Sequence, residues 1–163
     1  MPKIAKVPTE AELYQRYAAR CSTAEYAPAD ILQKAMRAGL DREAAERVVD
    51  RLIDENFINE ERYIRAFVHD KFAFNHWGKT KIEFALRQKR LSGPAIRNEL
   101  ENIDEQQYHD TLVDLLKSKN RQLAAATNFE RFKKLLAFAV SRGFETSLAY
   151  RIIEQEIGLS EDE

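Results

Sequence analysis

The side chains able to ligate a metal or act as nucleophiles are few in this chain. The three histidines have no metal-ligand spacing with one another or with the single cysteine, Cys21. Cys21 has no histidine near it in the sequence, so we expect a buried thiol rather than a nucleophile. Gly78-Lys79-Thr80 lacks the further glycine that a nucleotide-binding loop requires. The sequence therefore predicts a binding protein that is not an enzyme, with no metal and no cofactor.

Positive charge is concentrated in the middle of the chain, although the net charge of the whole is −1. Between residues 62 and 97, nine lysines and arginines stand against two acids, a surplus of seven. Ordinary solvated helix faces interleave both signs. A local surplus of this size is typical of a protein that binds a polyanion.

The candidate docking residues surround a junction that also holds the single tryptophan. They are Lys71, Trp77, Gly78, Lys79, Lys81, Arg87, Lys89 and Arg90, with a smaller basic group at Arg131, Lys133 and Lys134. Such cations attract either nucleic-acid phosphates or an acidic protein surface. The alternative is a solvated helix face, with Trp77, Phe72 and Phe74 packing at the junction rather than contacting a partner.

These residues belong to a chain that repeats one apolar pattern three times, at offsets of 51 and 53 residues. The corresponding positions are Ile31, Ile82 and Leu135; Ala35, Leu86 and Ala139; Leu40, Leu91 and Phe144; Ala45, Ile96 and Ala149; and Val49, Leu100 and Ile153. Steps of four residues are helical, and the steps of five span a break between two helices. The pattern indicates an array of similar helical units.

We therefore predict an all-α fold, an elongated tandem array of three three-helix units at residues 1–57, 58–103 and 104–163. The expected helices lie near 9–20, 28–38, 41–55, 59–75, 79–90, 92–102, 104–126, 128–141 and 144–157. No sustained alternation of period two predicts a strand. The predicted N-caps are Thr9, Asp41, Asn59, Ser92, Asp104 and Asn128, and Pro28 suits a first helical turn.

The sequence also bears on where the protein works. No apolar run approaches the roughly 20 residues that cross a bilayer. Residues 1–6 contain no apolar stretch typical of a secretion signal, and a single cysteine suits a reducing compartment. We expect a cytoplasmic monomer without membrane contact.

Several motifs resemble those of the RecX family of recombinase regulators. The stretch Leu52-Ile53-Asp54-Glu55-Asn56-Phe57-Ile58-Asn59-Glu60-Glu61-Arg62-Tyr63 is similar to a motif of that family, which commonly has Gly where this chain has Asn56. Ala66-Phe67-Val68 and Trp77-Gly78-Lys79-Thr80-Lys81-Ile82 continue the similarity into the next helix. Upstream, Arg20-Cys21-Ser22 and the residues from Ile31 to Gly39 are similar to the family's opening helices.

The resemblance implies tandem three-helix units and binding to the filament that RecA recombinase forms on single-stranded DNA. It further implies inhibition of the filament's ATPase, strand-exchange and co-protease activities, in DNA repair, recombination and SOS control. Contact with duplex DNA is expected to be weak. Two alternatives remain open: a helical-repeat protein that binds DNA directly, and a helical scaffold that binds another protein without DNA.

Overall fold

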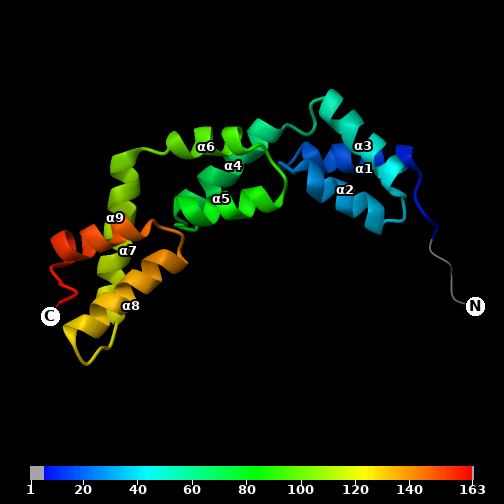
Figure 1. The fold of residues 1–163 in the computed structure, drawn as a ribbon. Coiled ribbons are helices and arrows are strands. Elements are labelled where there is room, and N and C mark those ends of the chain that lie inside the picture. The colour runs from blue at the N-terminus through cyan, green and yellow to red at the C-terminus, as the bar shows by residue number, and fades with distance from the viewer. Residues whose placement is uncertain (1–5, 163) are drawn as a thin grey trace, which may run out of the picture. The chain divides into compact units, whose positions relative to one another are not determined.

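The computed structural model describes residues 6–162, which form nine α-helices and a closing π-helix and contain no strand (Figure 1). The helices are α1 (Glu10–Cys21), α2 (Pro28–Arg37), α3 (Arg42–Asp54), α4 (Glu60–Ala73), α5 (Lys79–Gln88), α6 (Gly93–Glu101), α7 (Glu105–Gln122), α8 (Asn128–Ser141), α9 (Thr146–Ile152) and η1 (Ile153–Ile157). The prediction of an all-α fold is confirmed. The expectation about the first residues of the chain lies largely outside the described range.

The described residues pack into two compact units. Unit 1 contains the residues up to Phe67 together with Leu86–Ala95, and unit 2 contains Val68–Ala85 together with the residues from Ile96 onward. Helices α4, α5 and α6 therefore contribute residues to both units. The division into three successive repeats stays a prediction. Between residues 6 and 162, no helix is long and apolar enough to cross a membrane.

The apolar residues of the triplicated pattern form the cores of these units. Fourteen of the fifteen positions are buried, and only Leu40 is half-buried. The four-residue step of each copy lies on one helix, with Ile82 and Leu86 of α5 both fully buried. A spacing of four keeps two side chains on the same helical face. Burial of one such face is what stabilises short helices in water.

In each copy of the apolar pattern, the break between the two helices is a turn with one residue in the left-handed region. This residue is Gly39 with φ of 117°, Arg90 with φ of 59°, and Gly143 with φ of 95°. The residue after the glycine closes the preceding helix in the first and third copies of the pattern. The N–H of Leu40 donates to the carbonyl of Ala35 at 3.2 Å, and the N–H of Phe144 donates to the carbonyl of Ala139 at 3.1 Å. Glycine adopts this conformation without steric cost, whereas arginine does not.

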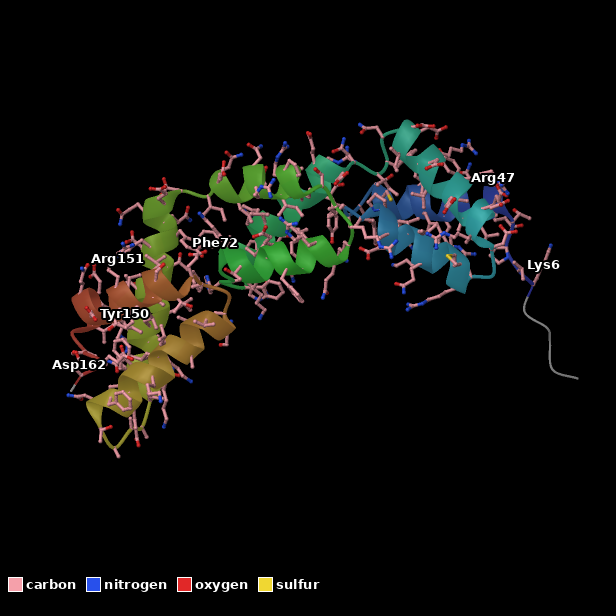
Figure 2. The ribbon with its side chains drawn as sticks, viewed as in Figure 1. Lys6, Arg47, Phe72, Tyr150, Arg151 and Asp162 are labelled. Atoms are coloured by element: carbon pink, nitrogen blue, oxygen red, sulfur yellow. The ribbon has the colours of Figure 1, made fainter. Side chains whose placement is uncertain are left out.

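Aromatic packing organises the interior of unit 2. Phe72, labelled in Figure 2, belongs to α4, and its ring lies 5.7 Å from the ring of Tyr108 on α7. The ring of Tyr108 in turn lies 5.1 Å from that of Phe144. Tyr108 is buried, as are Tyr14 and Tyr63 at the matching places of the first and fourth helices. These rings fix how the helices that carry them approach one another.

Helix starts follow the predicted caps, with one exception. Side-chain oxygens of Thr9, Asp41, Asn59 and Asp104 accept backbone N–H groups three residues on, at 2.8–3.1 Å. The prediction of an N-cap at residue 128 is wrong, because the hydroxyl of Thr127 accepts the N–H of Glu130 and α8 already begins at residue 128.

One helix boundary also needs correction. Helix α7 ends at Gln122, four residues earlier than predicted, since Leu123 adopts an extended conformation.

Candidate functional site

The junction between α4 and α5 holds two lysines over one tryptophan ring in unit 2. Nζ of Lys71 lies 4.8 Å and Nζ of Lys81 lies 4.4 Å from the centroid of the Trp77 ring. Trp77 is half-buried. A cation over an indole face is stabilised by about 0.5–1 kcal/mol at exposed sites, and by more as water is removed. The structure thus brings together three of the predicted docking residues.

The local backbone explains how this junction forms. After α4 the chain turns through His76 in the left-handed region, with φ of 54°. The N–H of His76 donates to the carbonyl of Phe72 at 3.1 Å, and the N–H of Trp77 donates to that of Lys71 at 2.9 Å. These bonds close the helix and turn the tryptophan back toward its last turn. Lys71 and Trp77 therefore meet through local geometry.

Gly78 packs directly against the turn between α8 and α9. Its N–H donates to the carbonyl of Arg142 at 2.8 Å, and the N–H of Thr80 donates to that of Gly143 at 3.0 Å. A Cβ on Gly78 would lie 2.3 Å from the carbonyl carbon and oxygen of Gly143. Only glycine fits this approach, so Gly78 acts in the packing that places the start of α5.

Lys79 takes part in a network around a buried phenol. Its backbone N–H donates to the hydroxyl of Tyr108 at 3.0 Å, and that hydroxyl donates to the carboxylate of Glu145 at 2.9 Å. Nζ of Lys79 lies 4.8 Å from the centroid of the same ring. Burial raises the pKa of Tyr108 well above its usual range, although the N–H of Lys79 favours the ionised form and opposes this. Tyr108 therefore stays a neutral donor to Glu145.

In unit 1, several cations lie at the end of α5 and in the turn that follows it, and they differ in how exposed they are. Nζ of Lys89 lies 2.9 Å and 2.8 Å from the two carboxylate oxygens of Asp30. Burial alone would lower the pKa of Lys89, but the hydrogen bond that Lys89 donates to Asp30 and the neighbouring Tyr63 outweigh burial, so the pKa is raised. Arg87 and Arg90 are exposed.

The sequence count therefore overstates the unneutralised charge. Lys89 is paired with Asp30, and Arg62 is paired with Glu25, so both are neutralised by acids far away in the sequence. Nothing in the sequence pattern identified these pairs, because partners 59 and 37 residues apart meet only after packing. Exposed ion pairs contribute little to stability, whereas partly buried ones also remove a charge from the surface field.

The cations of α8 contact their own helix, the end of α7 or the loop between the two helices. The guanidinium of Arg131 donates to the carbonyl and to the side-chain oxygen of Asn120, both at 2.9 Å. Nζ of Lys134 donates to the carbonyl of Ala124 at 3.1 Å. Nζ of Lys133 lies 5.0 Å from the Phe129 ring centroid on its own helix. Arg131 and Lys134 thus anchor the segment that links α7 to α8.

Sequence reasoning missed an exposed aromatic side chain in the basic segment. Phe84 on α5 is 64% exposed. A signal for it was present, since Ile82 and Leu86 mark the buried face and residue 84 lies on the opposite side of the helix. The sequence pattern does not distinguish Phe72 from Phe74, but the two differ in exposure: Phe72 is buried and Phe74 is 73% exposed.

Within residues 6–162, no three histidine, cysteine, aspartate or glutamate side chains gather in a way that holds a metal ion.

Comparison with known proteins identifies the basic segment in the middle of the chain as part of a known domain. Residues 59–100 match the model of the second three-helix domain of RecX. A regulatory protein RecX of Clostridium botulinum (strain Alaska E43 / Type E3) is 28% identical over 119 residues, which are 72% of this chain and 55% of that protein. One of Mycobacterium sp. (strain KMS) is 24% identical over 155 residues, 92% of this chain and 85% of that protein. The chain spans a little over half the length of the clostridial relatives.

Solved structures share the fold. The crystal structure of RecX from Lactobacillus salivarius aligns with a TM-score of 0.77 at 15% identity, covering 90% of this chain and 95% of that one. A second crystal structure of a regulatory protein RecX aligns with a TM-score of 0.76 at 19% identity, covering 89% of this chain and 73% of that one. Residues 59–100 thus match the second three-helix domain of RecX, and the chain as a whole is similar in sequence and in fold to proteins named regulatory protein RecX.

Proposed function

We propose that this protein regulates homologous recombination by binding the filament of a RecA-type recombinase on single-stranded DNA. In this role it lowers the filament's ATPase, strand-exchange and co-protease activities, and so acts in DNA repair and SOS control. It works in the cytoplasm as a monomer and is not an enzyme. The proposal is supported by the family, whose members are named regulatory proteins, and by the basic segment that the matched domain contains.

The observation that carries the docking assignment is the cluster of Lys71, Trp77 and Lys81. Both ammonium groups lie within 5 Å of one ring centroid, so a single aromatic side chain holds two positive charges at this junction. The fields of the two charges add at a nearby anion. A phosphodiester backbone supplies one negative charge per nucleotide and suits this arrangement.

The other predicted residues have graded roles in the proposal. Lys79, Arg87 and Arg90 add to the positive field, and Gly78 positions the start of α5 through its backbone contact. Lys89, Arg131 and Lys134 act mainly through their contacts with Asp30, Asn120 and Ala124. Lys133 stays in the proposed surface as a weaker member.

The test follows ATP turnover by a RecA-type recombinase on single-stranded DNA. The variant Lys71→Ala/Lys81→Ala removes both cations from the tryptophan ring. The matched control is Lys34→Ala/Lys119→Ala, which removes the same charge and two lysine–aromatic contacts, at 5.0 and 5.2 Å, elsewhere in the chain. We expect the wild type and the control to inhibit, and the first variant to need about tenfold more protein for the same inhibition.

Three results would overturn the proposal. The docking assignment is wrong if the Lys71→Ala/Lys81→Ala variant stays folded and inhibits fully. Binding to naked DNA with a steep salt dependence, and no effect on filament ATPase, would identify a DNA-binding protein without a recombinase partner. Inactivity in both assays would favour a helical scaffold for another protein.

A further inference from the structure

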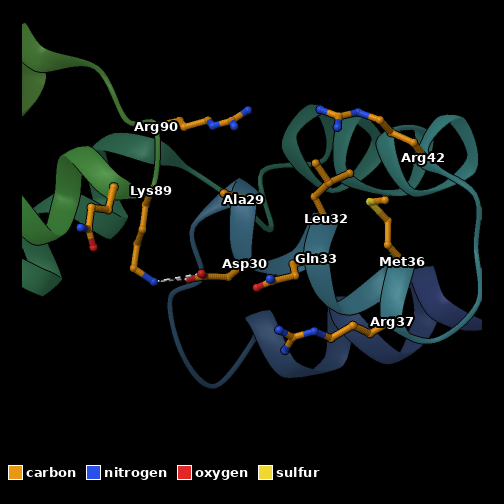
Figure 3. Close-up of a pocket in the computed structure, with 10 residues that line it drawn as sticks. Ala29, Asp30, Leu32, Gln33, Met36, Arg37, Arg42, Lys89 and Arg90 are labelled. Atoms are coloured by element: carbon orange, nitrogen blue, oxygen red, sulfur yellow. Dashed lines mark hydrogen bonds and ion pairs between the residues drawn. The ribbon is translucent and has the colours of Figure 1, made fainter.

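A groove on unit 1 has features that the proposed function does not explain. It encloses about 660 Å³ and is formed by α2, the first residue of α3 and the turn that follows α5 (Figure 3). Apolar side chains line its inner part, namely those of Ala29, Leu32 and Met36. Met36 is 40% exposed there. An exposed methionine is flexible and polarisable, and suits contact with apolar side chains of varied shape.

The rim of this groove is positively charged. Four cations line it, and the single acid among the lining residues, Asp30, is already paired with Lys89. Arg42 and Arg90 point toward each other from opposite sides in Figure 3, and Arg37 projects from the end of α2. Arg42 is ion-paired with Glu46 at 2.9 Å, which leaves Arg37 and Arg90 as the main sources of positive field.

Arg90 holds its place at a conformational cost. It lies in the left-handed region with φ of 59°, at the turn where the other two repeats carry Gly39 and Gly143. A side chain other than glycine is strained in this region, and such strain concentrates at binding sites. Arg90, at this strained turn, lines the groove.

We propose that this groove binds an acidic peptide segment that carries apolar side chains. Carboxylates would meet Arg37 and Arg90 at the rim, while an apolar side chain would lie against Met36 and Leu32. The inference refines the proposed function at Arg90, which it assigns to a protein partner, and it rests on the proposed function only there.

Two observations favour a peptide over a nucleic-acid strand. First, none of the described residues that line the groove is aromatic, so bases would lack the stacking surface on which single strands depend. Second, an adjoining hollow of about 220 Å³ shares Ala29, Leu32, Lys89 and Arg90 with the groove and is also lined by three acids, Glu46, Asp50 and Glu60. Glu46 is paired with Arg42, whereas Asp50 and Glu60 repel a continuous phosphate backbone that leaves the groove in that direction. A short acidic segment does not need to pass them.

The experiment measures fluorescence anisotropy of labelled probes with the full chain and without recombinase or DNA. The main probe is a helical peptide of about 12 residues with leucines four apart, flanked by Glu and Asp. One control peptide has the leucines replaced by serine, and a second has the acids replaced by their amides. A single-stranded oligonucleotide of equal charge is the fourth probe.

Two variants target the groove, and each has a matched control. Met36→Gln removes apolar surface, and its control is Val140→Gln, at the same place in the third repeat and 45% exposed. Arg90→Gly removes the charge while giving the turn the residue that suits it, and its control is Lys34→Gln on α2, outside the groove lining. Because glycine relieves the backbone, Arg90→Gly is expected to stay folded.

We expect only the acidic, leucine-containing peptide to bind tightly, and its affinity to fall about fivefold in Met36→Gln and in Arg90→Gly. The two control variants should bind as the wild type does. The proposal is overturned if the serine peptide binds equally well, if the oligonucleotide binds in the groove more tightly than the peptide, or if no peptide binds. None of these outcomes depends on recombinase inhibition, so failure here and failure of the proposed function are separate results.

Discussion

Replacement of Gly78 by alanine tests how the start of α5 is held in place. The added Cβ would lie 2.3 Å from the carbonyl carbon and oxygen of Gly143 and 2.4 Å from the backbone nitrogen of Phe144. All three are backbone atoms, which cannot move aside as the end of a flexible side chain does. To reach ordinary van der Waals contact, the two segments must separate by about 1 Å.

The magnitude follows from what this separation breaks. The N–H groups of Gly78 and Thr80 donate to carbonyls of the opposing turn at 2.8 and 3.0 Å. Each such bond contributes about 0.5–1.5 kcal/mol net, and overpacking at a tight contact costs about 1–3 kcal/mol. We therefore expect Gly78→Ala to lower the free energy of unfolding by about 2–4 kcal/mol.

The neighbouring tryptophan provides the assay. Trp77 is the single tryptophan of the chain, so its fluorescence during urea unfolding reports on this junction. The control is Gly93→Ala, because a Cβ there would meet only the guanidinium of Arg87, at an ordinary 3.5 Å. Should Gly78→Ala unfold within about 0.5 kcal/mol of the wild type, the close backbone approach is not a constraint in solution.

Three further predictions concern stability. As pH rises past about 10, tyrosines ionise in the unfolded chain, whereas the raised pKa keeps Tyr108 protonated in the folded protein. The free energy of unfolding should therefore fall as pH rises. In urea midpoints measured from pH 8 to 11, Tyr108→Phe should show a shallower fall than the wild type. Asp30→Asn should cost about 1 kcal/mol near neutral pH, because it leaves the half-buried ammonium of Lys89 without its carboxylate; an equal midpoint in urea would contradict this. Asn56 lies in the left-handed region with φ of 61°. Asn56→Gly should therefore leave the free energy of unfolding nearly unchanged, whereas Asn56→Ala should lower it by about 1 kcal/mol. Equal thermal midpoints for the two variants would refute the reasoning.

Much of the local structure could be predicted from the sequence. The caps at Thr9, Asp41 and Asp104 depend on a side-chain oxygen and an N–H only three residues apart. The recurring steps of four and five residues likewise predicted buried faces such as Ile82 and Leu86, because one turn of helix fixes which side chains share a face. Local rules decide these features before any tertiary contact forms.

The same local reasoning explains the departure of the RecX-like motif at residue 56. The family commonly has glycine there, and this chain has asparagine at a position with φ of 61°. Asparagine is among the few residues other than glycine that tolerate the left-handed region. The substitution therefore preserves the turn.

Only the tertiary structure decided which cations of the basic segment are neutralised by acidic side chains. Lys89 and Arg62 are neutralised by Asp30 and Glu25, which lie 59 and 37 residues away. Similarly, the need for glycine at position 78 comes from the backbone of Gly143, on a distant turn of the same unit. A charge pattern counts residues along the chain, whereas Coulomb and packing forces act through space. The sequence therefore determined the helices and their apolar faces, and packing of those faces determined the surface that a partner meets.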